Sequence, residues 1–228
     1  MSQGSNDRLL IVEELHLLLV KPEGGLETVP AYRAYAETAA LLVDLAVAGA
    51  VTVGEKETVS AQEDARGPEH PMLRQGWSAL AEGGPGTVGE LVRRPELDPG
   101  GTVEESLVAA GILERKSRGV LGLRFDRTPT VDPAPEEALR ARLAAVLAGR
   151  ERATVADTSL LALLNAGADA PRILRAEAAG MDRDQFAARV RELDADTTTS
   201  DAVSDAISAV STAVIGAVLV PTIIGGIL

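Results

Sequence analysis

The sequence predicts a mainly α-helical protein, a single compact globule of helices that carries short β-hairpins. Hydrophobic residues make up 46% of the 228 residues and aromatic residues only 2%, so Leu, Ala and Val have to build the core. Leu and Ala are good helix formers, whereas sheets that are poor in aromatic side chains pack badly. Apolar residues also recur at helical spacing over residues 31–48 and 135–147. These observations favour helices, with strands confined to hairpins near 50–60 and 112–125.

The first half of the chain is predicted to form helices around one hairpin. We expect residues 1–8 to be disordered, apart from helix capping by Asn6 or Asp7. Residues 9–20 should form an apolar helix that passes into extended chain, with Glu13 and Glu14 on a polar edge. The elements expected after it are a helix over 31–48 ended by Gly49, a hairpin of 50–53 and 57–60, a helix over 71–81 that carries Trp77, a glycine-rich break at 83–86, a helix through 92 capped by Thr87, and a helix over 102–110 ended by Gly111.

The second half of the chain continues this pattern and ends in an apolar tail. The expected elements are a hairpin of 112–115 and 120–125 around a turn at 116–119, a long helix over 135–147, a helix over 160–166 capped by Asp157, and helices over 172–178 and 184–193. We therefore divide the chain into a disordered start at 1–8, a helical domain at 9–200 and an apolar tail at 201–228.

Composition excludes several kinds of chemistry. The chain has no cysteine, which excludes disulfides, thiolate metal sites and a cysteine nucleophile. Its net charge of −12 disfavours nucleic acid as a partner and repels anionic membranes at long range. A local basic patch can still act within a Debye length of about 10 Å. No secretory signal is apparent, so we expect a cytoplasmic protein, which would meet a membrane on its cytoplasmic face.

The residues that could carry catalysis do not form a recognisable enzyme motif. His16 and His70 lack metal-ligand spacing, so we expect no metal and no cofactor. Glu13 and Glu14 are adjacent on a helix and point about 100° apart, so they do not share a site. The glycine-rich stretch at 83–86 lacks the Lys-Ser/Thr of a phosphate-binding loop. We interpret the protein as non-enzymatic.

The tail is unusual because residues 207–228 contain no charged side chain. As a helix it would span about 33 Å, enough to cross a bilayer core. It could pack on its own globule, enter or lie on a membrane, or form an oligomer contact, and the sequence leaves these alternatives open. Its candidate contact residues are Val214, Ile215, Val218, Leu219, Ile223 and Ile224.

Four segments, taken in order, resemble the Golgi phosphoprotein 3 family. They are LLIVEELHLLLVKPEGG at 9–25, ALLVDLAVAGAV at 40–51, LVAAGIL at 107–113 and SLLALLNA at 159–166, with PML at 71–73 as a further match. The resemblance covers roughly residues 9–193 and suggests a bacterial member. It implies a mostly helical fold with small hairpins, one of which protrudes and contributes to oligomerisation.

The resemblance also implies a function at a membrane surface. Eukaryotic members are peripheral Golgi adaptors that bind the phosphatidylinositol 4-phosphate headgroup through a Trp and several Arg, and that hold short tails of glycosyltransferases. In this chain the family's Trp falls near Val29, its first Arg at Thr38 and its other Arg pair at 97–100. These positions hold no base, so the headgroup contacts are expected from nearby residues: Tyr32, Arg33, Arg93, Arg94, Arg115, Lys116 and Arg118.

The leading function that the resemblance implies is therefore that of a peripheral membrane adaptor. Its partners would be an anionic lipid headgroup or membrane surface and further copies of the chain, not nucleic acid. The alternative is a soluble or self-assembling scaffold without lipid recognition, whose apolar tail serves assembly.

Overall fold

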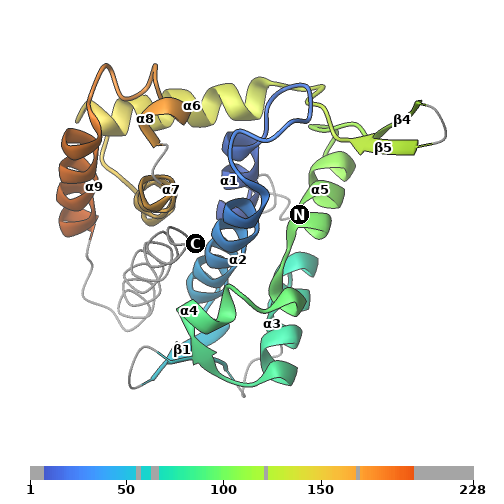
Figure 1. The fold of residues 1–228 in the computed structure, drawn as a ribbon. Coiled ribbons are helices and arrows are strands. Elements are labelled where there is room, and N and C mark those ends of the chain that lie inside the picture. Colours follow the sequence, from blue (N-terminus) through green and yellow to red (C-terminus); the bar gives the residue numbers. More distant parts are fainter. Residues whose placement is uncertain (1–7, 55–57, 63–66, 121–122, 168–169, 198–228) are drawn as a thin grey trace, which may run out of the picture.

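Two adjacent helices, α1 (Ile11–Leu19) and α2 (Pro30–Val47), run through the centre of the molecule (Figure 1). The structure is a computed structural model, and it describes residues 8–54, 58–62, 67–120, 123–167 and 170–197. Every residue of α1 is buried, and α2 is buried from Ala36 to Ala46. The remaining elements pack around this pair.

The other helices cover α1 and α2 from several sides (Figure 1). On one side lie α3 (Pro71–Gly83), α4 (Val88–Leu91), the 3₁₀ turn Pro95–Leu97 and α5 (Gly100–Ala109). On the other side lie α7 (Val155–Ala166), α8 (Ala170–Ile173) and α9 (Arg183–Thr197), and α6 (Ala134–Leu147) also contacts α1. The predicted fold class, mainly helical with short hairpins, is confirmed.

A small antiparallel sheet forms where the first hairpin was predicted, with one strand more than expected. β1 (Val51–Val53) pairs with β2 (Thr58–Ala61), and β2 pairs in turn with β3 (Gly86–Thr87). The third strand is only two residues long and follows the glycine-rich break. Such a strand carries no alternating pattern of its own, so only its partner reveals it.

The second hairpin is present, but its strands lie further along the chain than predicted. β4 (Lys116–Val120) includes the whole stretch that was predicted as the turn, and β5 (Leu123–Arg127) pairs with it from Lys116↔Arg127 to Val120↔Leu123. The prediction used apolar alternation, which marks a strand with one buried face. The β4–β5 pairing begins at two charged residues, Lys116 and Arg127, so this part of the strands lacks the apolar alternation.

Helix ends follow the local signals in part. Gly49 and Gly111 have φ of +66° and +75°, as expected for glycines that end α2 and α5. α7 starts at Val155, five residues before the predicted start, because Thr154 is the N-cap and Asp157 is the third helical residue in a capping box. The helix predicted over 172–178 is wrong in extent, because α8 is the four-residue helix Ala170–Ile173 and turns follow it. Asn6, Asp7 and the tail at 201–228 lie outside the described residues.

Candidate functional site

Carboxylates from α1 and α2 hold the start of α1. The Asp44 Oδ1 and Oδ2 atoms accept hydrogen bonds from the backbone N–H groups of Ile11 and Val12, each at 3.0 Å, and Glu13 Oε2 accepts from Leu10 N at 2.8 Å. Burial raises the pKa of Asp44 to about 7, against the effect of the two N–H donors. A residue of α2 therefore caps α1 in place of a local cap.

The predicted polar edge of α1 is wrong, because Glu13 and Glu14 are 4% and 5% exposed. Burial of two acids is tolerable when each is hydrogen-bonded or paired. Ser106 of α5 donates to Glu13 Oε1 at 2.6 Å, and Arg142 of α6 donates to Glu14 Oε2 at 2.7 Å. Arg142 also bonds Asp157 Oδ1 at 2.7 Å, so one guanidinium ties α1, α6 and α7 together.

A second buried polar cluster joins α1, α2 and α5. His16 Nδ1 lies 2.8 Å from Glu37 Oε1, and both side chains are fully buried. The Arg33 Nη1 atom lies 3.3 Å from Glu104 Oε1 and 3.9 Å from Glu37 Oε1. His16 Nε2, Glu37 Oε2 and Arg33 Nε have no hydrogen-bond partner among the described residues.

The glycine at the start of α5 lets the backbone approach this cluster closely. A Cβ atom at Gly100 would lie 3.3 Å from Glu37 Oε2 and 3.4 Å from Arg33 Nη2. The family resemblance places arginines at the positions of Thr38 and Leu97. These two residues lie next to each other beside the cluster, and the Thr38 hydroxyl is 3.5 Å from the Leu97 carbonyl oxygen. Arg33 therefore reaches this region from α2, but two carboxylates already face its charge.

Tyr32 lies away from this cluster, on the α7 side of α2. Its hydroxyl donates to the backbone carbonyl of Leu163, and its ring occupies the space where a side chain at Gly167 would lie. Tyr32 thus holds α2 to α7 and does not share a site with Arg33.

The arginine pair after α4 bonds to backbone carbonyls. Arg94 donates through Nη1 to Gly84 at 2.7 Å and to Gly83 at 3.1 Å, and through Nη2 to Pro85 at 3.1 Å. Arg93 donates to the carbonyl of Gly89. Arg94 in particular closes the glycine-rich turn, so much of its hydrogen-bonding capacity is already used.

The bases of the second hairpin are better exposed. The Arg115 and Lys116 side chains are 54% and 60% exposed, and among the described residues they pair with the exposed acids Glu105, at 3.8 Å, and Glu114, at 2.8 Å. Arg118 pairs through its backbone with Phe125. Sequence reasoning missed Arg127, which is exposed and lies directly opposite Lys116 in the ladder.

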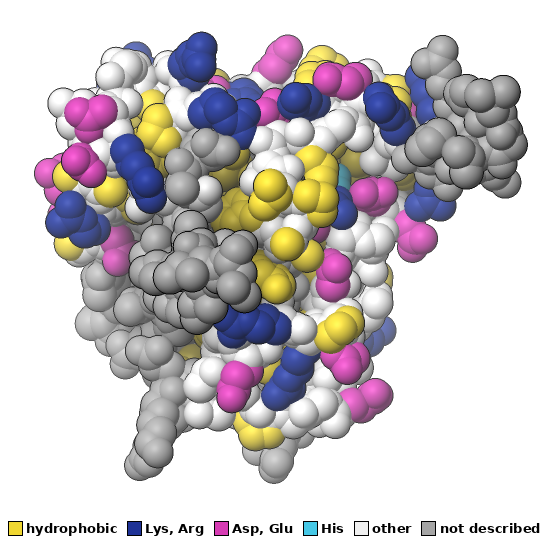
Figure 2. Space-filling view, in the orientation of Figure 1, with side chains coloured by type: hydrophobic (Ala, Val, Ile, Leu, Met, Phe, Trp, Pro, Cys, Tyr) yellow, Lys and Arg dark blue, Asp and Glu magenta, His cyan; other side chains and the backbone are white. Residues whose placement is uncertain are grey.

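The structure separates these two groups of bases. Arg93 and Arg94 precede α5 and the hairpin follows it, so the two groups lie at opposite ends of that helix (Figure 1). Figure 2 shows Lys and Arg side chains gathered where the hairpin leaves the globule. The predicted bases therefore fall into three places, at Arg33, at Arg94 and at the hairpin, and Tyr32 lies in a fourth, so these residues do not form one pocket.

The described residues contain neither a group of metal ligands nor a membrane-spanning helix. Among the residues that the structure describes, no three His, Cys, Asp or Glu side chains form a group that could hold a metal ion. No helix within the described ranges is both long enough and apolar enough to cross a membrane.

The described residues form a mainly helical globule with a buried polar centre and a projecting hairpin that carries exposed bases. A model of the family Golgi phosphoprotein 3 (GPP34) matches residues 11–210, and the chain belongs to this family. No curated protein matches the chain.

Proposed function

We propose that this protein is a peripheral membrane adaptor that meets an anionic membrane surface through the β4–β5 hairpin, on the cytoplasmic face of the membrane. The observation that carries the proposal is the arrangement of the hairpin. It projects from the globule (Figure 1) and carries exposed bases where it joins the globule.

Charge at the base of the hairpin supports this proposal. Lys116 and Arg127 lie directly opposite each other in the ladder, and like charges at such positions repel. The ion pairs of Arg115 and Lys116 with acids are exposed, and such pairs contribute little. Lipid phosphates that approach this end would relieve the repulsion, and each base near an anionic surface is worth about 1 kcal/mol.

The sequence that links the two strands of the hairpin is apolar and uncharged. Val120 pairs with Leu123 there, and the sequence between them is Leu121-Gly122. In the sequence, an apolar stretch at 120–123 thus follows the bases at 115, 116 and 118, and a basic segment with an apolar stretch suits the boundary between headgroups and acyl chains. Arg33 and Arg94 have the weaker claim, because carboxylates and backbone carbonyls already engage them.

The test is binding to vesicles of phosphatidylcholine that contain phosphatidylinositol 4-phosphate or phosphatidylserine. Lys116→Glu combined with Arg127→Glu should weaken binding at least about tenfold, and added salt should weaken binding of the wild type. The matched control is Arg150→Glu with Arg152→Glu, which makes the same charge change at exposed positions between α6 and α7. Preference between the two lipids tests headgroup specificity.

Two results would contradict the proposal. An equal loss of binding in the control would mean that total charge matters and the hairpin does not. If the wild type bound neither kind of anionic vesicle, the alternative of a scaffold without lipid recognition would be favoured.

A further inference from the structure

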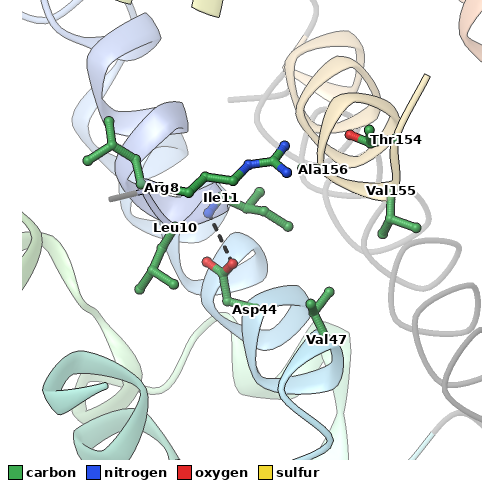
Figure 3. A pocket seen from close by; sticks show the side chains of 9 residues that line it. Arg8, Leu10, Ile11, Asp44, Val47, Thr154, Val155 and Ala156 are labelled. Carbon is green, nitrogen blue, oxygen red and sulfur yellow. Dashed lines mark hydrogen bonds between the residues drawn. The ribbon is translucent and has the colours of Figure 1, made fainter. Parts of the chain in front are cut away.

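A groove of about 320 Å³ opens where the start of α1, the end of α2 and the start of α7 meet (Figure 3). Most of the side chains that form its walls are aliphatic. These side chains are Leu9, Leu10, Ile11, Val47, Val155 and Ala156. Ligand pockets in proteins have volumes of roughly 300–1,000 Å³, so this groove lies at the small end of the range and suits a single short alkyl chain.

The aliphatic surface of the groove is open to solvent. Val47, the last residue of α2, is 50% exposed, which is unusual for a large hydrophobic side chain in this molecule. The lining side chains that are only partly buried are Leu9, Leu10, Val155 and Ala156. Contiguous apolar surface that stays exposed is typical of a place where an apolar group binds.

Arg8 adds a positive charge to this apolar surface. Figure 3 shows its side chain extending from the start of α1 across the groove toward α7. Arg8 is exposed, and no acid among the residues that the structure describes pairs with it. A guanidinium in this situation can bind a carboxylate through two parallel N–H hydrogen bonds.

The groove offers no matching contact to a cation. Asp44 is the one carboxyl group among its described lining residues, and its two oxygens already accept backbone hydrogen bonds from Ile11 and Val12, each at 3.0 Å (one is drawn in Figure 3). The helices α1 and α7 both begin at the groove, and the start of a helix favours negative charge. The complementary occupant therefore has an alkyl body and an anionic end.

We propose that this groove binds a free medium-chain fatty acid, with the alkyl chain against Val47 and the other aliphatic walls and the carboxylate on Arg8. The ligand is a fatty acid dissolved in water and not the acyl chain of a bilayer lipid, because the groove has room for one chain and its cation fits a terminal carboxylate. This proposal does not depend on the hairpin's role at membranes.

The first test is an NMR titration of the isotope-labelled full-length protein with octanoate and, separately, with the uncharged 1-octanol. Octanoate should produce saturable shifts of amides around the groove. Arg8→Gln should weaken octanoate binding at least about tenfold and leave 1-octanol binding unchanged, since the alcohol has no carboxylate to lose. Arg175→Gln is the matched control, because Arg175 is exposed after α8, at the other end of α7, and it should change neither affinity.

The second test locates the ligand and uses the absence of native cysteine. In the Val47→Cys variant the single thiol should react with iodoacetamide. Octanoate at about ten times its measured dissociation constant should slow this reaction about tenfold, because only the unbound fraction reacts. In the control variant Val131→Cys the thiol replaces a side chain of the same 50% exposure outside the groove, and octanoate should not slow its reaction.

Four outcomes would overturn the proposal. They are a wild type that shows no saturable binding of octanoate, an Arg8→Gln variant that binds octanoate as the wild type does, an Arg8→Gln variant that loses octanoate and 1-octanol equally, and a Val47→Cys thiol that octanoate does not protect. The third would mean that Arg8 shapes the groove without holding a carboxylate, and the fourth that octanoate binds elsewhere.

Discussion

Single residues at the centre of this molecule hold several elements at once. Asp44 belongs to α2 but caps α1, and Arg142 belongs to α6 but neutralises acids of α1 and α7. Both residues satisfy groups that would otherwise be buried without a partner, and such groups are costly. Substitution of either residue should therefore affect the whole fold.

The first prediction concerns Asp44 and pH. The pKa of its carboxyl is raised by burial from 3.8 to about 7, so the folded protein holds this proton more tightly than the unfolded chain. Its contribution to stability is therefore complete below about pH 4 and is lost as the pH rises through 7. The side chain at position 44 of the Asp44→Asn variant does not titrate. The unfolding free energy of the wild type, relative to that of the variant, should therefore fall by up to about 1.4 kcal/mol for each pH unit of increase within this window.

Urea unfolding of both proteins between pH 4 and 8 measures this difference. Asp44→Asn should be the less stable protein at pH 4, because its amide nitrogen faces a backbone N–H donor. A difference that stays constant with pH would mean that Asp44 ionises normally in the folded protein.

The second prediction concerns Arg142. Arg142→Met leaves Glu14 and Asp157, which are 6% and 0% exposed, without their cation. Loss of one partner from a buried pair typically costs 3–5 kcal/mol, so we expect a loss of about 3 kcal/mol in unfolding free energy at pH 7. Arg152→Met, at an exposed position before α7, should cost less than about 0.5 kcal/mol in the same denaturant experiment. Equal losses in both variants would contradict the role assigned to Arg142.

At the scale of elements, helix packing depends on close approach at particular glycines. In α3, a Cβ atom at Gly76 would lie 2.8 Å from Leu41 Cδ2 of α2, so the missing side chain sets the distance between these helices. Gly101 in α5 has open space around its Cβ position instead.

The third prediction compares these two glycines. Alanine in a helix is favoured over glycine by up to about 1 kcal/mol. Gly101→Ala should therefore raise the unfolding free energy, whereas Gly76→Ala should lower it by about 1–3 kcal/mol because the core is overpacked. Thermal or urea unfolding monitored by circular dichroism checks both. A stabilising Gly76→Ala would mean that α2 and α3 separate easily.

At the scale of the whole molecule, charge and apolar surface are unevenly distributed. The net charge is −12, yet exposed bases gather at the hairpin, and residues 207–228 have no charge at all. We therefore expect the hairpin and the C-terminal segment to interact with different partners.

The fourth prediction concerns deletion of residues 207–228. If the segment lies on its own globule, its loss exposes aliphatic surface worth roughly 25 cal/mol per Å². We expect Tm to fall by roughly 4–8 °C, the effect of about 2 kcal/mol in a domain of this size, while light scattering gives one chain per particle before and after deletion. An unchanged Tm with a smaller particle would instead indicate that the segment serves assembly.

Local physics made much of this fold predictable from the sequence. Periodicity placed α2 and α6, Gly49 and Gly111 marked helix ends, and the β-branched run at 51–53 marked the first hairpin. These signals act between residues a few positions apart, so they can be read without knowledge of the tertiary structure. The family resemblance was likewise carried by the order of local segments.

Tertiary structure alone decided which groups meet and which bases remain available. Glu14 is bonded by a residue 128 positions away, and Asp44 caps a helix 33 positions before it. No local signal could show that carbonyls engage Arg94 or that Lys116 faces Arg127, because partners distant in sequence and strand register are set by packing of the whole chain. The sequence by itself determined the helical class and the family, whereas the burial of the acids and the exposure of the bases follow from how the helices pack.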